Sequence, residues 1–203
     1  MEDVTGAAGK LAAQSNYSWK TTVVVPESSP FKPGPTEGKT EKGGFTQLSM
    51  SFGERSTQIA TSGEKAAITD QDGDWQLATE MEKAEGPGRF MAMLAKNVRR
   101  PAEEARELAT AAHDMKKEGD VYRAPLTEAG AKAQFRFGAA KEAKASVTFW
   151  LKDGALSKYE FKVQGKVDFG GNEVEVDRTT TVEIKEVGTT KVVVPEAAKK
   201  KLG

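Results

Sequence analysis

Two stretches of alternating apolar and polar residues, one near each end of the chain, predict β-strands. In the first stretch, residues 16–25 place apolar or β-branched side chains at every second position, which is the period of a strand with one buried face. Four shorter alternating segments follow, separated by glycine-containing turns of the kind that tight hairpins require. These segments are residues 37–42, 45–52, 57–61 and 65–69, and a turn at residues 70–74 leads on to Trp75 and Leu77. We therefore predict an antiparallel meander over residues 16–79.

The second alternating stretch, between residues 146 and 185, is the stronger of the two. Apolar residues occupy one face of the predicted strands, and Lys, Glu, Asp and Thr residues occupy the other. Hairpin turns are predicted at residues 153–154 and 170–172. A sheet with one apolar and one charged face is wet on one side only, so its apolar face must be covered. The predicted C-terminal strands span residues 119–194 and include a last short strand at residues 192–194.

Between these stretches the apolar period lengthens to three or four residues, which predicts helices. Residues 88–98 carry large apolar side chains on one helix face. Residues 101–117 predict a second helix, with Lys116 and Lys117 near its C-terminal end, where positive charges stabilise the helix dipole. Residues 86–117 are therefore the predicted helical cover of the sheet.

Strands followed by helices and then by strands again predict an α+β fold rather than a parallel α/β fold. We expect a curved antiparallel sheet, a half-barrel, covered on its concave side by two or three helices. No linker interrupts the pattern, so residues 1–203 are predicted to form a single domain. Its predicted parts are an N-terminal helix (1–15), the meander (16–79), the helical cover (86–117), the C-terminal strands (119–194) and a terminal tail (195–203) that starts with a helical turn. Within residues 119–194, Thr127 is predicted to cap a short helix.

Composition excludes several classes of protein. The 203 residues include 30 Lys and Arg and 30 Asp and Glu, and this balance argues against a nucleic-acid binder, which normally has a basic excess. No apolar run approaches the roughly 20 residues that span a bilayer, so no transmembrane segment is predicted. Without cysteine the chain forms no disulfide, thiolate metal site or cysteine nucleophile. Residues 1–4 lack the start of a signal peptide, which favours the cytoplasm, although a chain whose export signal had been removed would look the same.

Two motifs that resemble reactive sites have simpler explanations. His113 is predicted to lie late in a helix, where the helix dipole stabilises it, and no G-x-S-x-G nucleophile motif accompanies it. Asp70, Asp72 and Asp74 resemble the start of a calcium loop, but the glycine and glutamate that an EF-hand requires further on are missing. These aspartates are better explained as an acidic hairpin turn.

The remaining candidates also have structural explanations. Residues 86–88 are glycine-rich but lack the Lys-Ser/Thr of a phosphate-binding loop. Glu103 and Glu104 fit the first turn of a helix, and Glu173 and Glu175 fit a solvated strand face. We therefore predict no catalytic residue, no metal site and no cofactor, and we expect a protein that is not an enzyme.

The C-terminal strands and the first strand together resemble a known family. Residues 151–202 (LKDGALSKYEFKVQGKVDFGGNEVEVDRTTTVEIKEVGTTKVVVPEAAKKKL) and the opening strand NYSWKTTV resemble exported bacterial proteins of the LolA-like and LppX-like lipoprotein superfamily. The resemblance implies an unclosed β-barrel covered by helices, with an apolar cavity for lipid or lipoprotein acyl chains. It also implies a periplasmic or other extracytoplasmic location; the cytoplasm is the alternative if the chain is complete as given. We expect a monomer, with peripheral association with the envelope.

The predicted function is that of a non-enzymatic carrier for a lipid or other hydrophobic ligand, bound between sheet and helices. Methionine packs adaptably and suits a site that accepts flexible chains. The candidate ligand residues are Phe90, Met91, Met93, Leu94, Phe149, Trp150 and Phe161. The alternative is that these residues are ordinary core, and that the protein is a structural or interaction protein of the cell envelope with a closed core and no ligand.

Overall fold

A computed structural model describes residues 1–29, 32–52, 55–83, 87–135, 139–169 and 172–203. The strands are β1 (Asn16–Val24), β2 (Thr36–Glu41), β3 (Phe45–Phe52), β4 (Arg55–Ser62), β5 (Lys65–Thr69), β6 (Trp75–Leu77), β7 (Lys116–Glu118), β8 (Val121–Pro125), β9 (Ala140–Lys152), β10 (Ala155–Phe169) and β11 (Asn172–Lys185). The helices are α1 (Glu2–Ala13), α2 (Ala78–Met81), α3 (Pro87–Lys96), α4 (Pro101–Ala111), α5 (Glu128–Lys132) and α6 (Glu196–Leu202).

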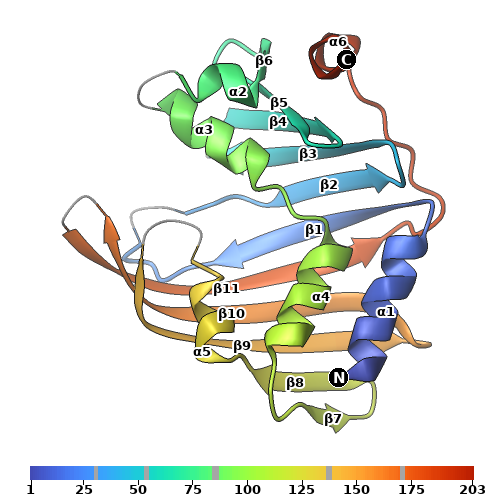
Figure 1. Ribbon diagram of the computed structural model, residues 1–203, viewed down its shortest axis with the longest axis vertical. Coiled ribbons are helices and arrows are strands. Elements are labelled where there is room, and N and C mark those ends of the chain that lie inside the picture. The colour runs from blue at the N-terminus through green and yellow to red at the C-terminus, as the bar shows by residue number, and fades with distance from the viewer. Residues whose placement is uncertain (30–31, 53–54, 84–86, 136–138, 170–171) are drawn as a thin grey trace. The chain divides into compact units, whose positions relative to one another are not determined.

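The strands of the described residues form one antiparallel sheet of eleven strands (Figure 1). Their order is β6-β5-β4-β3-β2-β1-β11-β10-β9-β8-β7, so the sheet begins at β6, ends at β7 and is not closed. Most neighbours are consecutive in the chain, as the hairpin turns in the sequence predict. The prediction of an α+β fold built on an open antiparallel sheet is confirmed.

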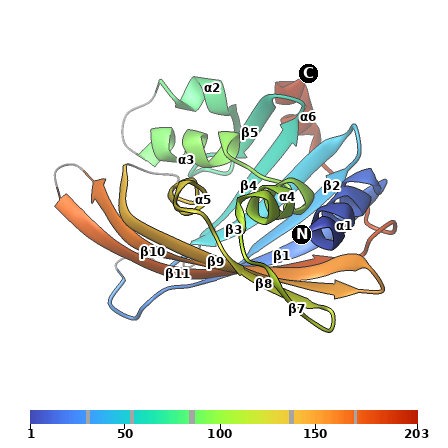
Figure 2. The same ribbon diagram turned by 60° about the horizontal axis from the view of Figure 1, so that its bottom comes forward.

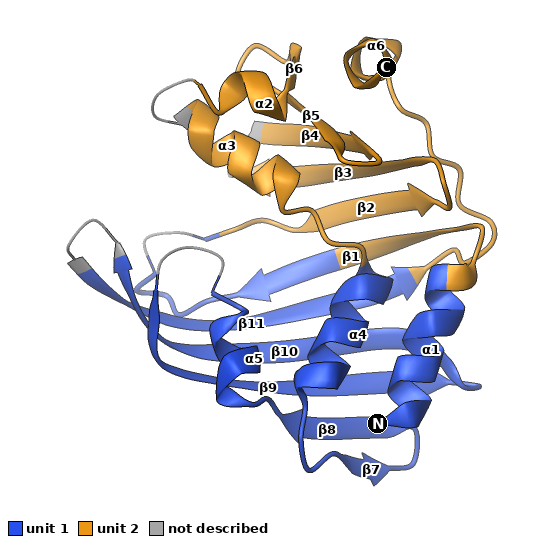
Figure 3. Cartoon of the chain, viewed as in Figure 1, with its two compact units in different colours: residues 1–12, 21–32, 101–184 blue, residues 13–20, 33–100, 185–203 orange. Residues whose placement is uncertain are grey.

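The chain divides into two compact units (Figure 3). Unit 1 contains residues 1–12, 21–32 and 101–184, and unit 2 contains residues 13–20, 33–100 and 185–203. Each unit is described by itself below. The single domain over residues 1–203 stays a prediction.

Unit 1 is a curved sheet with helices on one face. Helices α1, α4 and α5 all lie on the same side of strands β8 to β11 (Figures 1 and 2). The side chains between the helices and the sheet are fully buried, among them Phe149 and Tyr159 of the sheet and Leu108 of α4. Along β9 buried and exposed residues alternate, so the predicted division into an apolar and a polar face is confirmed. Between β9 and β10, Asp153 (φ 52°) and Gly154 (φ 73°) form the predicted tight turn.

Unit 2 has helices on both faces of its sheet. Ile59 and Ile68 are paired across β4 and β5 and are completely buried on the face that α3 contacts. Their neighbours Ala60 and Ala67 point to the other face because strand residues alternate. There they pack against α6, in a cluster with Val194, Ala198 and Leu202. Alanines at this contact let the helix backbone approach the sheet closely.

The second predicted helix ends earlier than the sequence indicates. Helix α4 stops at Ala111, and Asp114 has a φ of 48°, a left-handed conformation that ends helices. Lys116 and Lys117 belong to strand β7 and not to a helix, so the prediction that they stabilise a helix dipole is wrong. His113 also lies beyond the helix, where its backbone N–H donates to the carbonyl of Pro125 at 3.1 Å. Pairing of β7 with β8 explains the change, because it replaces helical hydrogen bonds with strand hydrogen bonds.

A further difference concerns the C-terminal part of the chain. Residues 192–194 form no strand in the described part of the chain; Val192 and Val194 instead pack in the cluster beneath α6. The apolar alternation there therefore arises from helix packing and not from strand pairing. The glycines of the turn predicted at residues 170–172 lie outside the described residues.

Candidate functional site

Helix α3 buries its small residues and leaves its large ones half-exposed. Ala92 and Ala95 are completely buried, whereas Phe90 is 38% exposed and Met91 and Leu94 are half-buried. Helix α3, predicted as part of the helical cover of the sheet, packs on β4 and β5, and its two buried alanines lie at this contact. Ile59 and Ile68 already fill the space above the sheet, and a close helix then requires small residues at the contact.

Helical geometry divides the large side chains of α3 between two flanks. Successive residues are about 100° apart around the axis, so Met91 and Leu94 lie on one side of the buried alanines and Lys96 lies on the other. The ammonium of Lys96 contacts the carboxylate of Glu82, directly after α2, at 2.6 Å. Because α2 lies over β5 and β6, the flank with Met91 and Leu94 faces the opposite way, toward β3.

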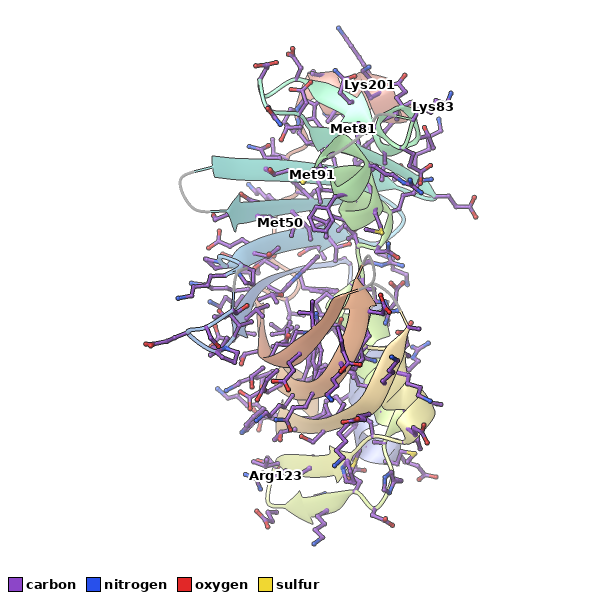
Figure 4. The ribbon with its side chains drawn as sticks, turned by 90° about the vertical axis from the view of Figure 1, so that its left-hand side faces the viewer. Met50, Met81, Lys83, Met91, Arg123 and Lys201 are labelled. Carbon is purple, nitrogen blue, oxygen red and sulfur yellow. The ribbon has the colours of Figure 1, made fainter. Side chains whose placement is uncertain are left out.

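Strand β3 brings a third residue to this flank. Leu48 pairs with Ile59 of β4, so it shares the sheet face on which α3 lies, and Met50 occupies the next position on that face. Met50 is half-buried, as are Met91 and Leu94. Figure 4 shows Met50 on its strand and Met91 on the neighbouring helix. We call Met50, Met91 and Leu94 the methionine surface.

An aromatic ring from β1 lies over β2, the strand next to β3. Gly38 of β2 pairs with Leu48, and the indole ring of Trp19 lies directly over Gly38, where any side chain would overlap with it. The Trp19 ring is buried and contacts Tyr17, with ring centroids 5.8 Å apart. Sequence reasoning missed this contact, although a glycine within a strand often marks a close approach of another group.

The other predicted ligand residues lie in unit 1. Phe149 and Phe161 are buried on either side of Tyr159, with ring centroids 6.3 and 6.4 Å apart from it. Trp150 projects from the opposite, polar face of β9, and the ammonium of Lys158 lies 4.3 Å from its ring centroid. The seven predicted residues therefore divide between the two units, with Phe90, Met91, Met93 and Leu94 in unit 2.

A carboxylate in the first turn of α4 is buried in unit 1. Glu104 lies in that first turn, as predicted, and accepts a hydrogen bond of 2.7 Å from the hydroxyl of Tyr159. A signal for this burial was available, because Glu104 falls in the stripe formed by Pro101, Ala105 and Leu108 at helical spacing. This polar contact fixes α4 on β10.

A polar cluster fixes α1 to the β7–β8 hairpin. One carboxylate oxygen of Asp3 accepts from the hydroxyl of Tyr122 at 2.6 Å and from the ammonium of Lys117 at 3.0 Å. These two interactions hold the pKa of Asp3 below its ordinary value. Hydrogen bonding with Tyr122 and Asp3 raises the pKa of Lys117. Asp3 and Lys117 are exposed and Tyr122 is buried, and the cluster serves the local structure of unit 1.

The remaining acidic groups show no arrangement for chemistry. Asp70 accepts backbone N–H groups of Asp72 and Asp74 at 3.0 and 2.9 Å, which is the geometry of the predicted acidic turn. Across the described ranges, no three His, Asp or Glu side chains converge as metal ligands. In the same ranges, no helix is both long and apolar enough to cross a bilayer.

Comparison with known proteins gives a match at the level of structure. No protein-family model and no curated protein matches the sequence. LprF from Mycobacterium bovis superposes with a TM-score of 0.51 and 13% identity, covering 97% of this chain and 96% of LprF. This chain has the fold of LprF. The lipoprotein LppX from Mycobacterium tuberculosis is also similar, with a TM-score of 0.48 and 8% identity, covering 95% of this chain and 96% of LppX. The likeness to LprF confirms the predicted fold, an α+β protein with an unclosed antiparallel sheet.

Proposed function

We propose that this protein binds and carries an apolar ligand, a lipid or another molecule with an acyl chain, in the bacterial cell envelope, without converting it chemically. The observation that carries this proposal is the orientation of α3, which buries alanines and leaves Met91 and Leu94 half-exposed on the flank that faces β3, the strand of Met50. A group of large apolar side chains at the surface is a feature of contact sites.

The chemistry of this surface suits a flexible hydrocarbon chain. Methionine is unbranched and polarizable, so Met50 and Met91 can adapt to many ligand conformations without the strain that branched residues would impose. The shared fold with LprF supports the proposal, because the resemblance in the sequence associates this fold with acyl-chain carriage. It also supports an extracytoplasmic location.

A second candidate function is favoured by the interior of unit 1. Phe149 and Tyr159 are completely buried there, and Glu104 makes a hydrogen bond within the same interior. A closed core of this kind suits an interaction or structural protein of the envelope that carries no ligand. The two functions make different predictions for the methionine surface. A carrier binds an acyl chain there, whereas a structural or interaction protein does not.

Titration with a fluorescent fatty-acid analogue tests the proposal. We expect saturable binding at a defined stoichiometry, and we expect Met91→Gln to weaken it about tenfold, because burying an amide in place of a thioether costs about 1–2 kcal/mol. Met115→Gln is the matched control, since Met115 is also half-buried but belongs to unit 1. Absence of saturable binding by the parent protein, or equal effects of both substitutions, would favour the closed interaction protein.

A further inference from the structure

The outer side of α3 combines an exposed aromatic residue with a positive charge. Phe90 points away from the buried alanines of the helix and is 38% exposed. Met93 lies beside it, half-buried, and the exposed Arg89 lies on the same flank as Met93. We call Arg89, Phe90 and Met93 the α3 ridge. It is distinct from the methionine surface, which occupies the other flank of the helix.

The sequence around the ridge is basic. Residues 87–100 contain four basic side chains and no acidic one. Lys96 contacts Glu82, directly after α2, at 2.6 Å, and Glu80 of α2 accepts from the backbone N–H of Leu77 at 3.2 Å and contacts the ammonium of Lys201 at 3.4 Å. The exposed Arg89 is therefore the positive charge that the ridge itself offers.

We propose that the α3 ridge docks on the surface of an anionic lipid bilayer. Phe90 and Met93 would enter the boundary between headgroups and acyl chains, while Arg89 would remain at the level of the lipid phosphates. A stable protein partner would require roughly 800 Å² of buried surface on each side, which a ridge of three residues on a ten-residue helix does not supply. Bilayer docking requires only a few inserted side chains and a matching charge. It does not depend on the proposed ligand, so the two proposals can fail separately.

Sedimentation with lipid vesicles tests this docking on the full chain. Vesicles of phosphatidylglycerol and phosphatidylcholine in equal parts should bind the protein, and binding should weaken as salt is raised. Arg89→Gln should weaken binding by roughly fivefold, the contribution expected of one basic residue at an anionic surface. Phe90→Ser should weaken it at every salt concentration, because it removes the inserted side chain.

Two matched controls keep the outcome interpretable. Lys144→Gln removes an exposed charge on β9, and Val193→Ser removes an apolar side chain that is 74% exposed; both should bind as the parent does. If Phe90→Ser does not fold, Arg89→Gln and the salt dependence still test the docking proposal. Equal binding to pure phosphatidylcholine vesicles, or no difference between ridge and control variants, overturns the proposal. Fatty-acid binding that persists without vesicle binding would overturn the docking alone.

Discussion

At the scale of single residues, the contact between Trp19 and Gly38 links the first strand to the meander of unit 2. The ring of Trp19 occupies the space that a side chain at residue 38 would need, and the ring itself is buried. Glycine at this position is therefore a requirement of packing and not of backbone conformation.

The substitution Gly38→Ala should destabilise the protein by about 1–3 kcal/mol, because the added methyl group displaces a packed aromatic ring. Urea unfolding followed by tryptophan fluorescence measures both the stability and the environment of Trp19. Gly6→Ala is the control, since no atom lies within 4 Å of a methyl group at this position in α1. It should stabilise the helix by roughly 0.5–1 kcal/mol. A Gly38→Ala variant as stable as the parent would show that the ring does not pack on β2.

The cluster around Asp3 gives a prediction about pH. The pKa of Asp3 in the folded protein lies below the value of about 3.9 expected for an unfolded chain. Its stabilising effect is therefore complete above that pH and is lost as the pH falls through the folded pKa. Asp3→Asn should be less stable than the parent at pH 7, and the difference should disappear toward pH 2. Urea unfolding at a series of pH values checks this, and a difference that does not change with pH would contradict it.

At the scale of elements, α4 is held on its sheet by a polar contact within an apolar interior. The hydroxyl of Tyr159 donates to the carboxylate of Glu104 across the boundary between β10 and α4. The hydrogen bond joins one residue of the helix to one residue of the strand, so it helps to set the rotation of the helix about its own axis.

Tyr159→Phe should lower the free energy of unfolding by about 1 kcal/mol, the usual net worth of a hydrogen bond. Glu104→Gln should cost less, since its amide oxygen still accepts from Tyr159. Chemical denaturation measures both variants, and amide exchange reports whether α4 loosens selectively. If Glu104→Gln proved the more damaging substitution, the hydrogen bond would not be the feature that fixes α4.

The helices also show how far sequence patterns reach. The pattern located α3 and α4 within a few residues, because long periodic segments determine the type of element. It failed on the face of α3, since Phe90, Met91, Met93 and Leu94 leave apolar residues around most of the helix. Packing against Ile59 and Ile68 of the sheet determines which face of α3 is buried. The sequence of the helix alone contains no information about this packing. The methionine surface was therefore half-predicted: Met91 and Leu94 were expected, and Met50 was not.

At the scale of the whole molecule, the antiparallel sheet could be predicted from hairpin turns that are visible in the sequence, such as the turn at Asp153 and Gly154. The pairing of β1 with β11 did not, because those strands are far apart in the chain and only the sheet order joins them. Each compact unit is likewise built from segments that are far apart in the chain: unit 1 contains the N-terminal residues and unit 2 contains the C-terminal residues.

Circular dichroism should show more sheet than helix, and heating should give one cooperative transition. Strand β1 contributes residues to both units, so melting of either one should disturb the other through a shared strand. Differential scanning calorimetry checks the number of transitions. Two well-separated transitions would show that the units are independent domains, against the prediction of a single domain.

The most direct test of the carrier function observes the methionine surface itself. The chain has six methionines, and labelling their methyl groups with ¹³C gives a small set of signals for nuclear magnetic resonance. A fatty acid with a nitroxide spin label near the end of its chain broadens the methyl signals close to its binding site. We predict that the signals of Met50 and Met91 broaden saturably at a defined stoichiometry, while that of Met115 in unit 1 stays sharp. Unchanged Met50 and Met91 signals at saturating label, or equal broadening of all six, would contradict the account.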